Sequence, residues 1–155
     1  MVAQMLEINE ILDQPQTADA QLTLPFGDRQ RSRLRTQLDS GEEVGLMLPR
    51  GHVLRDGDCL RASDGRIVAV CAAVETVSTA YAEDAQLLAR AAYHLGNRHM
   101  PLQVGAGWLR YRHDHVLDEM VKGLGLVVHT EQAPFEPESG AYHGGHHPLL
   151  QLHGH

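Results

Sequence analysis

Short runs of alternating apolar and polar residues fill the first half of the chain, and this two-residue period is typical of β-strands with one buried face. Turn residues such as Asp39-Ser40-Gly41 separate the runs. The runs cover residues 21–24, 31–38, 44–48 and 67–74. Short strands between turns predict a small all-β sandwich or barrel, which we assign to residues 1–74.

The period changes to that of an α-helix near Asp84, where apolar residues begin to recur every three or four positions. One helix is predicted to start at Asp84 and to end near Gly96. A second helix is predicted over residues 115–123, and its last residue, Gly123, is expected to stop it. Asp114 is the expected N-cap of this second helix.

Four strands are predicted around these helices. They cover residues 74–81, 101–104, 108–112 and 126–130. The resulting order, β-α-β-β-α-β, is that of a ferredoxin-like domain, which we assign to residues 75–140. The fold class is therefore α+β, with an all-β domain followed by a ferredoxin-like one. Beyond Gln132 the chain has no Lys or Arg and is expected to build no core, so residues 141–155 are predicted to form a flexible tail.

Composition narrows the function. The chain has 155 residues, and 13 Lys and Arg against 20 Asp and Glu give a formal net charge of −7, which argues against nucleic-acid binding. No apolar run approaches the roughly 20 residues that a membrane helix needs. Two cysteines cannot form a disulfide framework, and the first residues do not form a secretory signal. We expect a soluble cytoplasmic protein.

Histidine is the one residue type that stands out, with 11 in the chain. Neutral imidazole is a common ligand of Zn, Cu, Fe and Ni, so a cluster of histidines predicts a metal-binding tail. The cluster lies at the end of the chain and consists of His143, His146, His147, His153 and His155. These residues are interspersed with Gly, Pro and Leu, unlike the consecutive histidines of a purification tag.

Three further histidines are candidate ligands. His113 and His115 flank Asp114 where a strand is predicted to meet a helix. In a strand the two side chains would point the same way and could share an ion, whereas in a helix they would diverge by roughly 200°. His99 lies in the loop after the first helix. His113 and His115 could equally be solvated loop residues, and His99 taken alone fits better as a loop histidine that is hydrogen-bonded to nearby backbone.

No motif of a known catalytic centre is present. The chain has no His-Glu-x-x-His helix, no Gly-x-Ser-x-Gly elbow and no phosphate-binding loop. Candidate ligands without a recognisable nucleophile or base favour binding over turnover, so we do not expect an enzyme.

Three blocks of sequence resemble the UreE family of urease accessory proteins. They are Tyr93-His94-Leu95-Gly96-Asn97-Arg98-His99 with Pro101-Leu102-Gln103, then Leu109-Arg110-Tyr111 with His113-Asp114-His115-Val116-Leu117-Asp118, and Pro134-Phe135-Glu136-Pro137-Glu138 with Gly140-Ala141-Tyr142. The resemblance implies a nickel metallochaperone that delivers Ni²⁺ during urease maturation. It also implies partners, namely the urease maturation GTPase and the urease apoprotein complex, which the β domain would contact.

The resemblance further implies a homodimer formed by the metal-binding domain. His99 would pair with its mate across the two-fold axis to hold nickel, His113 and His115 would form a peripheral site, and tail histidines would complete or buffer these sites. Arg112 stands where some family members carry another histidine, and the tail is short. Ligand chemistry alone does not exclude Zn²⁺ or Cu²⁺, and Cu²⁺ would bind imidazole more tightly than Ni²⁺.

Two other classes of function fit the residues. One is a small zinc hydrolase that uses His99, His113 and His115, with Asp114 or Asp118 as its base. The other is a metal-independent interaction module. It would present Arg31, Arg33 and Arg35, which share one face if they lie in one strand, to an acidic partner.

Overall fold

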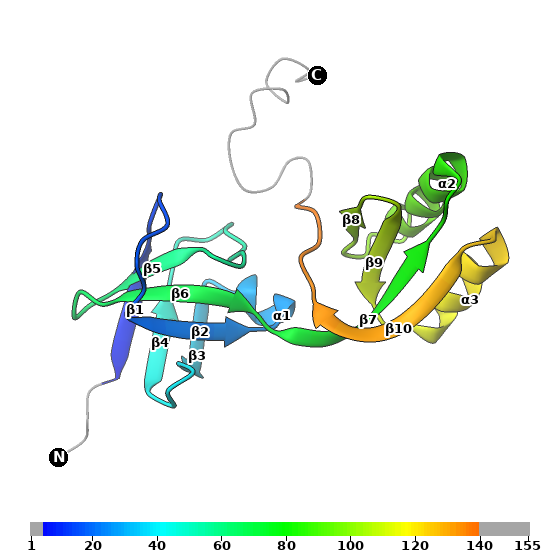
Figure 1. Ribbon diagram of the computed structural model, residues 1–155. Helices are drawn as coiled ribbons and strands as arrows, with labels where there is room; N and C mark the ends of the chain where they lie inside the picture. Colours follow the sequence, from blue (N-terminus) through cyan, green and yellow to red (C-terminus); the bar gives the residue numbers. More distant parts are fainter. Residues whose placement is uncertain (1–4, 140–155) are drawn as a thin grey trace. The chain divides into compact units, whose positions relative to one another are not determined.

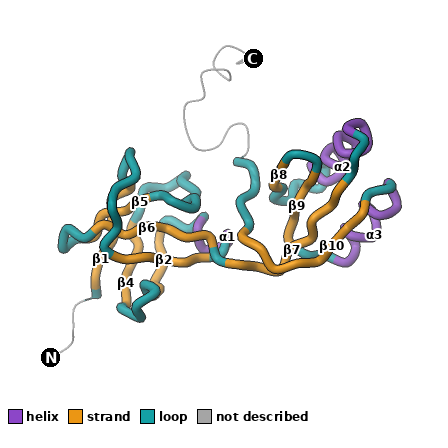
Figure 2. Tube along the Cα trace, viewed as in Figure 1, coloured by secondary structure: helices purple, strands orange, loops and turns teal. Residues whose placement is uncertain are grey.

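The computed structural model describes residues 5–139, which fall into two compact units (Figure 1). The first contains residues 5–72 and Ser139, and the second contains residues 73–138. The predictions made for the histidine-rich tail lie outside the described residues. Within them, strands predominate and helices are few, so the chain is a mixed α+β protein with two units, as the sequence predicts (Figure 2).

All six strands of the first unit belong to one mixed sheet, in the order β2-β6-β5-β1-β4-β3. Neighbouring strands are antiparallel except for the parallel pairs β1/β4 and β2/β6. A single helical turn, α1 (Phe26–Arg29), follows β2. The strands are β1 (Leu6–Ile11), β2 (Ala20–Leu24), β3 (Arg33–Gln37), β4 (Glu43–Met47), β5 (Cys59–Ala62) and β6 (Ile67–Ala72).

The edges of this sheet approach each other at Asp39. The backbone N–H of Asp39 donates to the carbonyl of Gln21 at 2.9 Å, and its carboxylate accepts from the hydroxyl of Thr23, also at 2.9 Å. Because Asp39 follows edge strand β3 and the other two residues belong to edge strand β2, the sheet curls until its edges meet at this end. The apolar residues of all six strands form one enclosed cluster.

The three arginines of the run predicted over residues 31–38 do not all lie in one strand, which corrects that part of the prediction. Arg33 and Arg35 lie on the exposed side of β3. Arg31 precedes the strand, and its backbone N–H donates to the carbonyl of Asp28 in α1. The interaction module therefore has two of its three expected arginines on one face.

Arg29 is a fully buried cation at the end of α1. Its Nε donates to the carbonyl of Leu24 at 3.1 Å, and its Nη1 donates to the carbonyl of Leu54 at 3.0 Å. The guanidinium carbon also lies 5.6 Å from the ring centre of Phe26. Arg29 thus connects three separate stretches of backbone inside the first unit.

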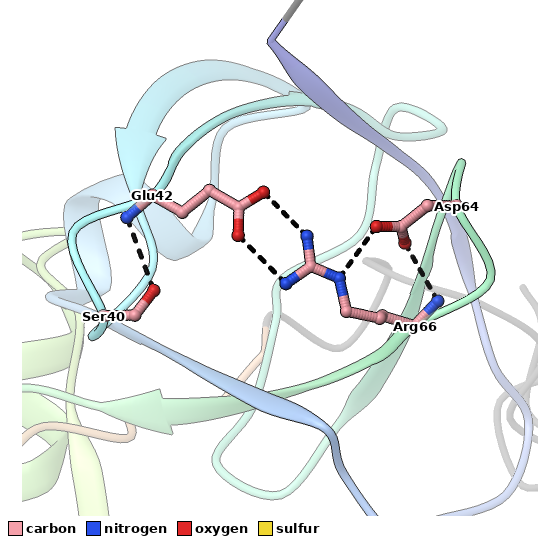
Figure 3. A network of polar contacts seen from close by, with 4 residues as sticks. All are labelled: Ser40, Glu42, Asp64 and Arg66. Atoms are coloured by element: carbon pink, nitrogen blue, oxygen red, sulfur yellow. Dashed lines mark hydrogen bonds and ion pairs between the residues drawn. The ribbon is translucent and has the colours of Figure 1, made fainter.

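A surface ion-pair network holds two turns of the same unit together (Figure 3). Arg66 forms two hydrogen bonds with Glu42, at 2.9 and 2.7 Å, and a third with Asp64 at 2.8 Å. The side-chain hydrogen bonds from Arg66 lower the pKa of Glu42, and the bond from the Arg66 backbone N–H is the largest cause of the lowered pKa of Asp64. The network is exposed, so it orders the turns more than it stabilises the fold.

The second unit has a four-stranded antiparallel sheet in the order β10-β7-β9-β8. One buried cluster contains residues of both helices and of the sheet, so both helices cover the same face. The elements are β7 (Val74–Tyr81), α2 (Ala85–Gly96), β8 (Gln103–Gly105), β9 (Trp108–Arg112), α3 (His115–Leu124) and β10 (Val127–Pro134). Their sequence along the chain is the predicted β-α-β-β-α-β.

Several boundaries of this unit differ from the prediction. Strand β8 covers residues 103–105 rather than 101–104, and β10 starts at Val127. Helix α3 passes through Gly123 and ends before Gly125, whose φ of 109° is the left-handed conformation that glycine adopts at helix ends. Strand β10 continues to Pro134, and Phe135 is fully buried. The expectation that no core residue follows Gln132 is therefore wrong: a single large aromatic side chain suffices to anchor a segment of otherwise poor composition.

The face of this second sheet opposite the helices carries a stack built on Gly105. The indole ring of Trp108, the chain's one tryptophan, lies so close to Gly105 that an added Cβ would overlap ring carbons. The guanidinium carbon of Arg110 lies 4.6 Å from the centre of the indole ring, and Arg110 forms an ion pair with Glu131 at 3.0 Å. Glycine is required at position 105 because of this close approach.

We expect Gly105→Ala to displace the indole and to lower the free energy of unfolding by about 1–3 kcal/mol, since the ring must leave its place over β8. The emission maximum of Trp108 and a urea unfolding curve measure both effects. Gly123→Ala is the matched control, because no atom lies within 4 Å of the added Cβ and alanine favours a helix. Unchanged fluorescence in Gly105→Ala would contradict the stacked arrangement.

Candidate metal-binding site

His99 is held on a tight turn at the end of α2. Asn97 caps the helix, and the backbone N–H of His99 donates to the carbonyl of Gly96 at 3.0 Å. His99 has a φ of 55°, and it is the one non-glycine residue with positive φ among residues 5–139. This left-handed conformation costs an ordinary L-residue roughly 1–2 kcal/mol. The side chain of His99 is exposed, so its imidazole is open to a ligand.

His113 lies just after β9, and its ring is fixed by hydrogen bonds. Its backbone N–H donates to the carbonyl of Thr76 at 3.2 Å. The ring nitrogen Nδ1 lies 3.1 Å from Oγ of Ser78 and 3.2 Å from Oδ2 of Asp118. The side chain is 40% exposed, so one edge of the ring contacts buried groups and the rest is open to solvent.

The partner carboxylate, Asp118, is itself fixed. It is only 5% exposed, and its Oδ1 accepts a hydrogen bond of 2.7 Å from the hydroxyl of Tyr111. Burial raises the pKa of Tyr111 far above its ordinary value, and the hydrogen bond to Asp118 raises it further. The phenol therefore remains a donor to Asp118 throughout the accessible pH range.

His115 is the first residue of α3 and is exposed. Between it and His113 lies Asp114, whose backbone is extended and whose carboxylate caps α3 by accepting from the N–H of Leu117 at 3.0 Å. The His-Asp-His block is thus divided between the end of a strand and the first turn of a helix. Asp114 is the predicted N-cap, and Asp84 caps α2 in the same way.

The structure does not gather the three candidate histidines into one centre. Within residues 5–139, no group of three or more His, Cys, Asp or Glu side chains is arranged to hold a metal ion. The proposed bases of the zinc hydrolase are also engaged, Asp114 as a helix cap and Asp118 between Tyr111 and His113. Residues 5–139 of a single chain therefore do not provide the site that the hydrolase alternative requires. The candidate ligands of the tail lie outside the described residues, namely His143, His146, His147, His153 and His155.

Matches to family models cover both units. Residues 7–73 match the UreE urease accessory protein, N-terminal domain, and residues 75–155 match the UreE urease accessory protein, C-terminal domain. The chain belongs to the UreE family of urease accessory proteins. UreE proteins are accessory proteins rather than enzymes, as the sequence predicts.

Individual UreE relatives match over most of their length. The urease accessory protein UreE of Alkalilimnicola ehrlichii is 64% identical over 140 residues, which cover 90% of this chain and 86% of that protein. The UreE of Pseudomonas putida strain W619 is 53% identical over 152 residues, which cover 97% of this chain and 94% of that one. The UreE of Vibrio parahaemolyticus is 57% identical over 132 residues, which cover 80% of this chain and 83% of that protein.

The remaining histidines of this UreE chain that the structure describes have aromatic neighbours or no assigned role. The ring centre of His129 lies 5.7 Å from that of Tyr81, and the ring centre of His94 lies 5.3 Å from that of Tyr93. Among residues 5–139 no helix is long and apolar enough to cross a membrane.

Sequence reasoning found the histidines of this UreE chain but missed the groups that orient one of them. Tyr111 and His113 are two residues apart, and this spacing could have placed them on one side of β9. The approach of Ser78 from the neighbouring strand β7 has no local signal, because it depends on the register that pairs Ser78 with Tyr111.

Proposed function

We propose that this UreE protein binds Ni²⁺ and delivers it to the urease apoprotein during urease maturation. Membership of the UreE family supports a role in urease maturation. The observation that carries the nickel-binding part is that His99, His113 and His115 are all exposed, while residues 5–139 of one chain form no closed ligand set. A site with open positions suits a carrier, which must release its ion, whereas closed four-ligand sites are structural.

The missing ligands would come from a second copy and from the tail. In the proposed homodimer, His99 of each chain holds one ion at the two-fold axis, and His113 and His115 hold ions at the periphery. His143, His146, His147, His153 and His155 complete or buffer these sites. Imidazole ligands suit Ni²⁺, and Zn²⁺ or Cu²⁺ is expected to compete for the same sites.

The proposed division of labour follows the two units. Residues 1–74 would bind partner proteins, residues 75–140 would bind metal and dimerise, and residues 141–155 would form the metal-binding tail. The second unit is proposed to be ferredoxin-like, because its strand order β10-β7-β9-β8 is antiparallel and both helices cover one face. The partners would be the maturation GTPase and the urease apoprotein complex, in the cytoplasm. Neither nucleic acid nor membrane is an expected partner.

Acid is expected to weaken nickel binding. Free imidazole has a pKa of about 6.5, and only its neutral form binds metal. Between pH 7.5 and 5.5 a site with two imidazoles should therefore lose about 100-fold in affinity, with protons displaced on binding. Sites with more histidines should lose affinity more steeply, so ions held by the tail should leave before the His99-centred ion.

Isothermal titration of the full chain with Ni²⁺ at several pH values tests this proposal. A second chain that ends at residue 142 is the comparison, and it should bind fewer ions while its metal-free melting temperature stays the same. An affinity that stays constant from pH 7.5 to 5.5 would show that histidine is not the principal ligand, and the proposed function would fail.

A further inference from the structure

Asp118 is a buried carboxylate in the first turn of a surface helix. Its side chain is 7% exposed, whereas that of Glu119, the next residue, is 61% exposed. The ion pairs found among the described residues join Asp118 to His113 and to no Lys or Arg. Burying a carboxylate is costly unless its oxygens are hydrogen-bonded, so the contacts of Asp118 must satisfy both oxygens.

The two oxygens have different donors. Oδ1 accepts from the hydroxyl of Tyr111 at 2.7 Å, and Oδ2 faces Nδ1 of His113 at 3.2 Å. A carboxylate offers only acceptors, so Nδ1 must carry the hydrogen of this contact. The hydroxyl of Ser78, 3.1 Å from the same nitrogen, then acts as a second acceptor.

A neutral imidazole has one N–H and one bare nitrogen, so a hydrogen on Nδ1 leaves Nε2 with a free lone pair. Nδ1 is on the edge of the ring that contacts Asp118, and Nε2 is on the opposite edge. Because the side chain is 40% exposed, this opposite edge is the one that a metal ion can reach. Carboxylate–histidine–metal arrangements of this kind orient ligands and raise their basicity.

We propose that Asp118, held by Tyr111, is a positioning residue that fixes His113 in the Nδ1–H form with Nε2 presented to an incoming Ni²⁺. The choice of metal rests on the proposed function, whereas the form of the ring does not. The side-chain hydrogen bonds and ion pairs of the described residues give neither His99 nor His115 a comparable carboxylate partner. His113 is therefore the pre-oriented ligand of the His-Asp-His block, and His115 is an adaptable one.

The test substitutes the carboxylate by its isostere. In Asp118→Asn the amide can donate to Nδ1, which moves the ring hydrogen to Nε2 and removes the lone pair that the metal needs. Two-bond ¹H–¹⁵N correlation spectra of the metal-free full chain at about pH 8 distinguish the two forms. We expect Nδ1–H for His113 in the wild type and a shift to Nε2–H in Asp118→Asn. Glu119→Gln makes the same change of charge one residue away and should alter nothing.

Nickel titration provides the second measurement. Asp118→Asn should lower the affinity for the same secondary ions that His113→Ala weakens, by about 10- to 100-fold. The double variant of these two substitutions should be no weaker than His113→Ala alone, because both act on one ligand. Tyr111→Phe keeps the carboxylate and should lower the affinity for the same ions severalfold. This variant replaces Asp118→Asn in the test if Asp118→Asn fails to fold.

The outcomes distinguish the positioning role of Asp118 from the role of His113 as a nickel ligand. A wild-type His113 in the Nε2–H form would overturn the positioning role of Asp118, whatever the result of the nickel titration. An Nδ1–H ring combined with nickel binding that survives both His113→Ala and Asp118→Asn would overturn His113 as a ligand, and with it the use of the network in metal binding.

Discussion

Replacing His99 by alanine is expected to abolish the tightest nickel-binding phase and to leave the weaker phases in place. In the proposed dimer one ion lies between two copies of His99, so one substitution removes two ligands at once. Each tenfold loss of affinity corresponds to about 1.4 kcal/mol, and the loss of two imidazoles should weaken the site by at least about 100-fold. His113→Ala, by contrast, leaves His115 at its site and should weaken only secondary binding.

Isothermal titration of the variant and wild type at pH 7.5 measures this difference. His52→Ala is the matched control, because it removes an equally exposed imidazole from the first unit, where no metal site is proposed. An unchanged tight phase in His99→Ala would refute the shared site. Sedimentation of the metal-free variant shows whether the dimer persists without this side chain, and we expect that it does.

Replacing Arg29 by methionine is expected to lower the free energy of unfolding by about 2–4 kcal/mol. Methionine fills most of the space but donates nothing, so the carbonyl oxygens of Leu24 and Leu54 lose charged donors at buried positions. The two segments that these carbonyls belong to are then joined less firmly to α1. Urea unfolding followed by circular dichroism measures the loss.

Arg61→Met is the control for this second prediction. Arg61 lies on β5 with a side chain that is 43% exposed, and its contact with Glu10, at 3.4 Å, is a surface ion pair. Such pairs contribute about 0–1 kcal/mol, so Arg61→Met should change stability little. If both variants lost the same free energy of unfolding, the buried hydrogen bonds of Arg29 would stabilise the fold no more than a surface ion pair does.

Local signals predicted the second unit well. The strands β7 and β9 have the bounds that the sequence predicts. Helix α3 begins after its expected N-cap, Asp114, and α2 begins one residue after its predicted start, Asp84, which caps it. An aspartate that can accept from the helix's own first N–H groups acts over three or four residues, so sequence inspection detects it. The end of α3 was misplaced because a helix tolerates an interior glycine such as Gly123 for about 1 kcal/mol.

Strand β1 illustrates why the first unit was harder to predict. Its pairing with β5 is irregular between Ile8 and Glu10, and a bulge of this kind breaks the two-residue alternation on which strand prediction depends. The role of Arg29 was missed for another reason. A buried arginine is recognised only by its partners, and Leu54 lies 25 residues away along the chain.

The candidate ligands could be chosen from the sequence, but their arrangement could not. The pair His113 and His115 was left open between a strand and a helix because the boundary falls between them. Only the fold shows that the carboxylate of Asp118 turns inward and meets the ring of His113. The expectation that three histidines could share one centre in a single chain failed because spacing along a chain does not fix convergence in space.

The left-handed backbone of His99 sets a trade-off between stability and function. At a φ of 55°, glycine or asparagine would fit the turn after α2 with less strain than histidine. A chain optimised for thermal stability alone would therefore discard this imidazole. His99→Gly should accordingly melt at a higher temperature than His99→Ala in the absence of metal, although both lack the ligand. Stability screens of metal-free protein would thus enrich variants that have lost the imidazole of His99, which is the side chain proposed to bind Ni²⁺.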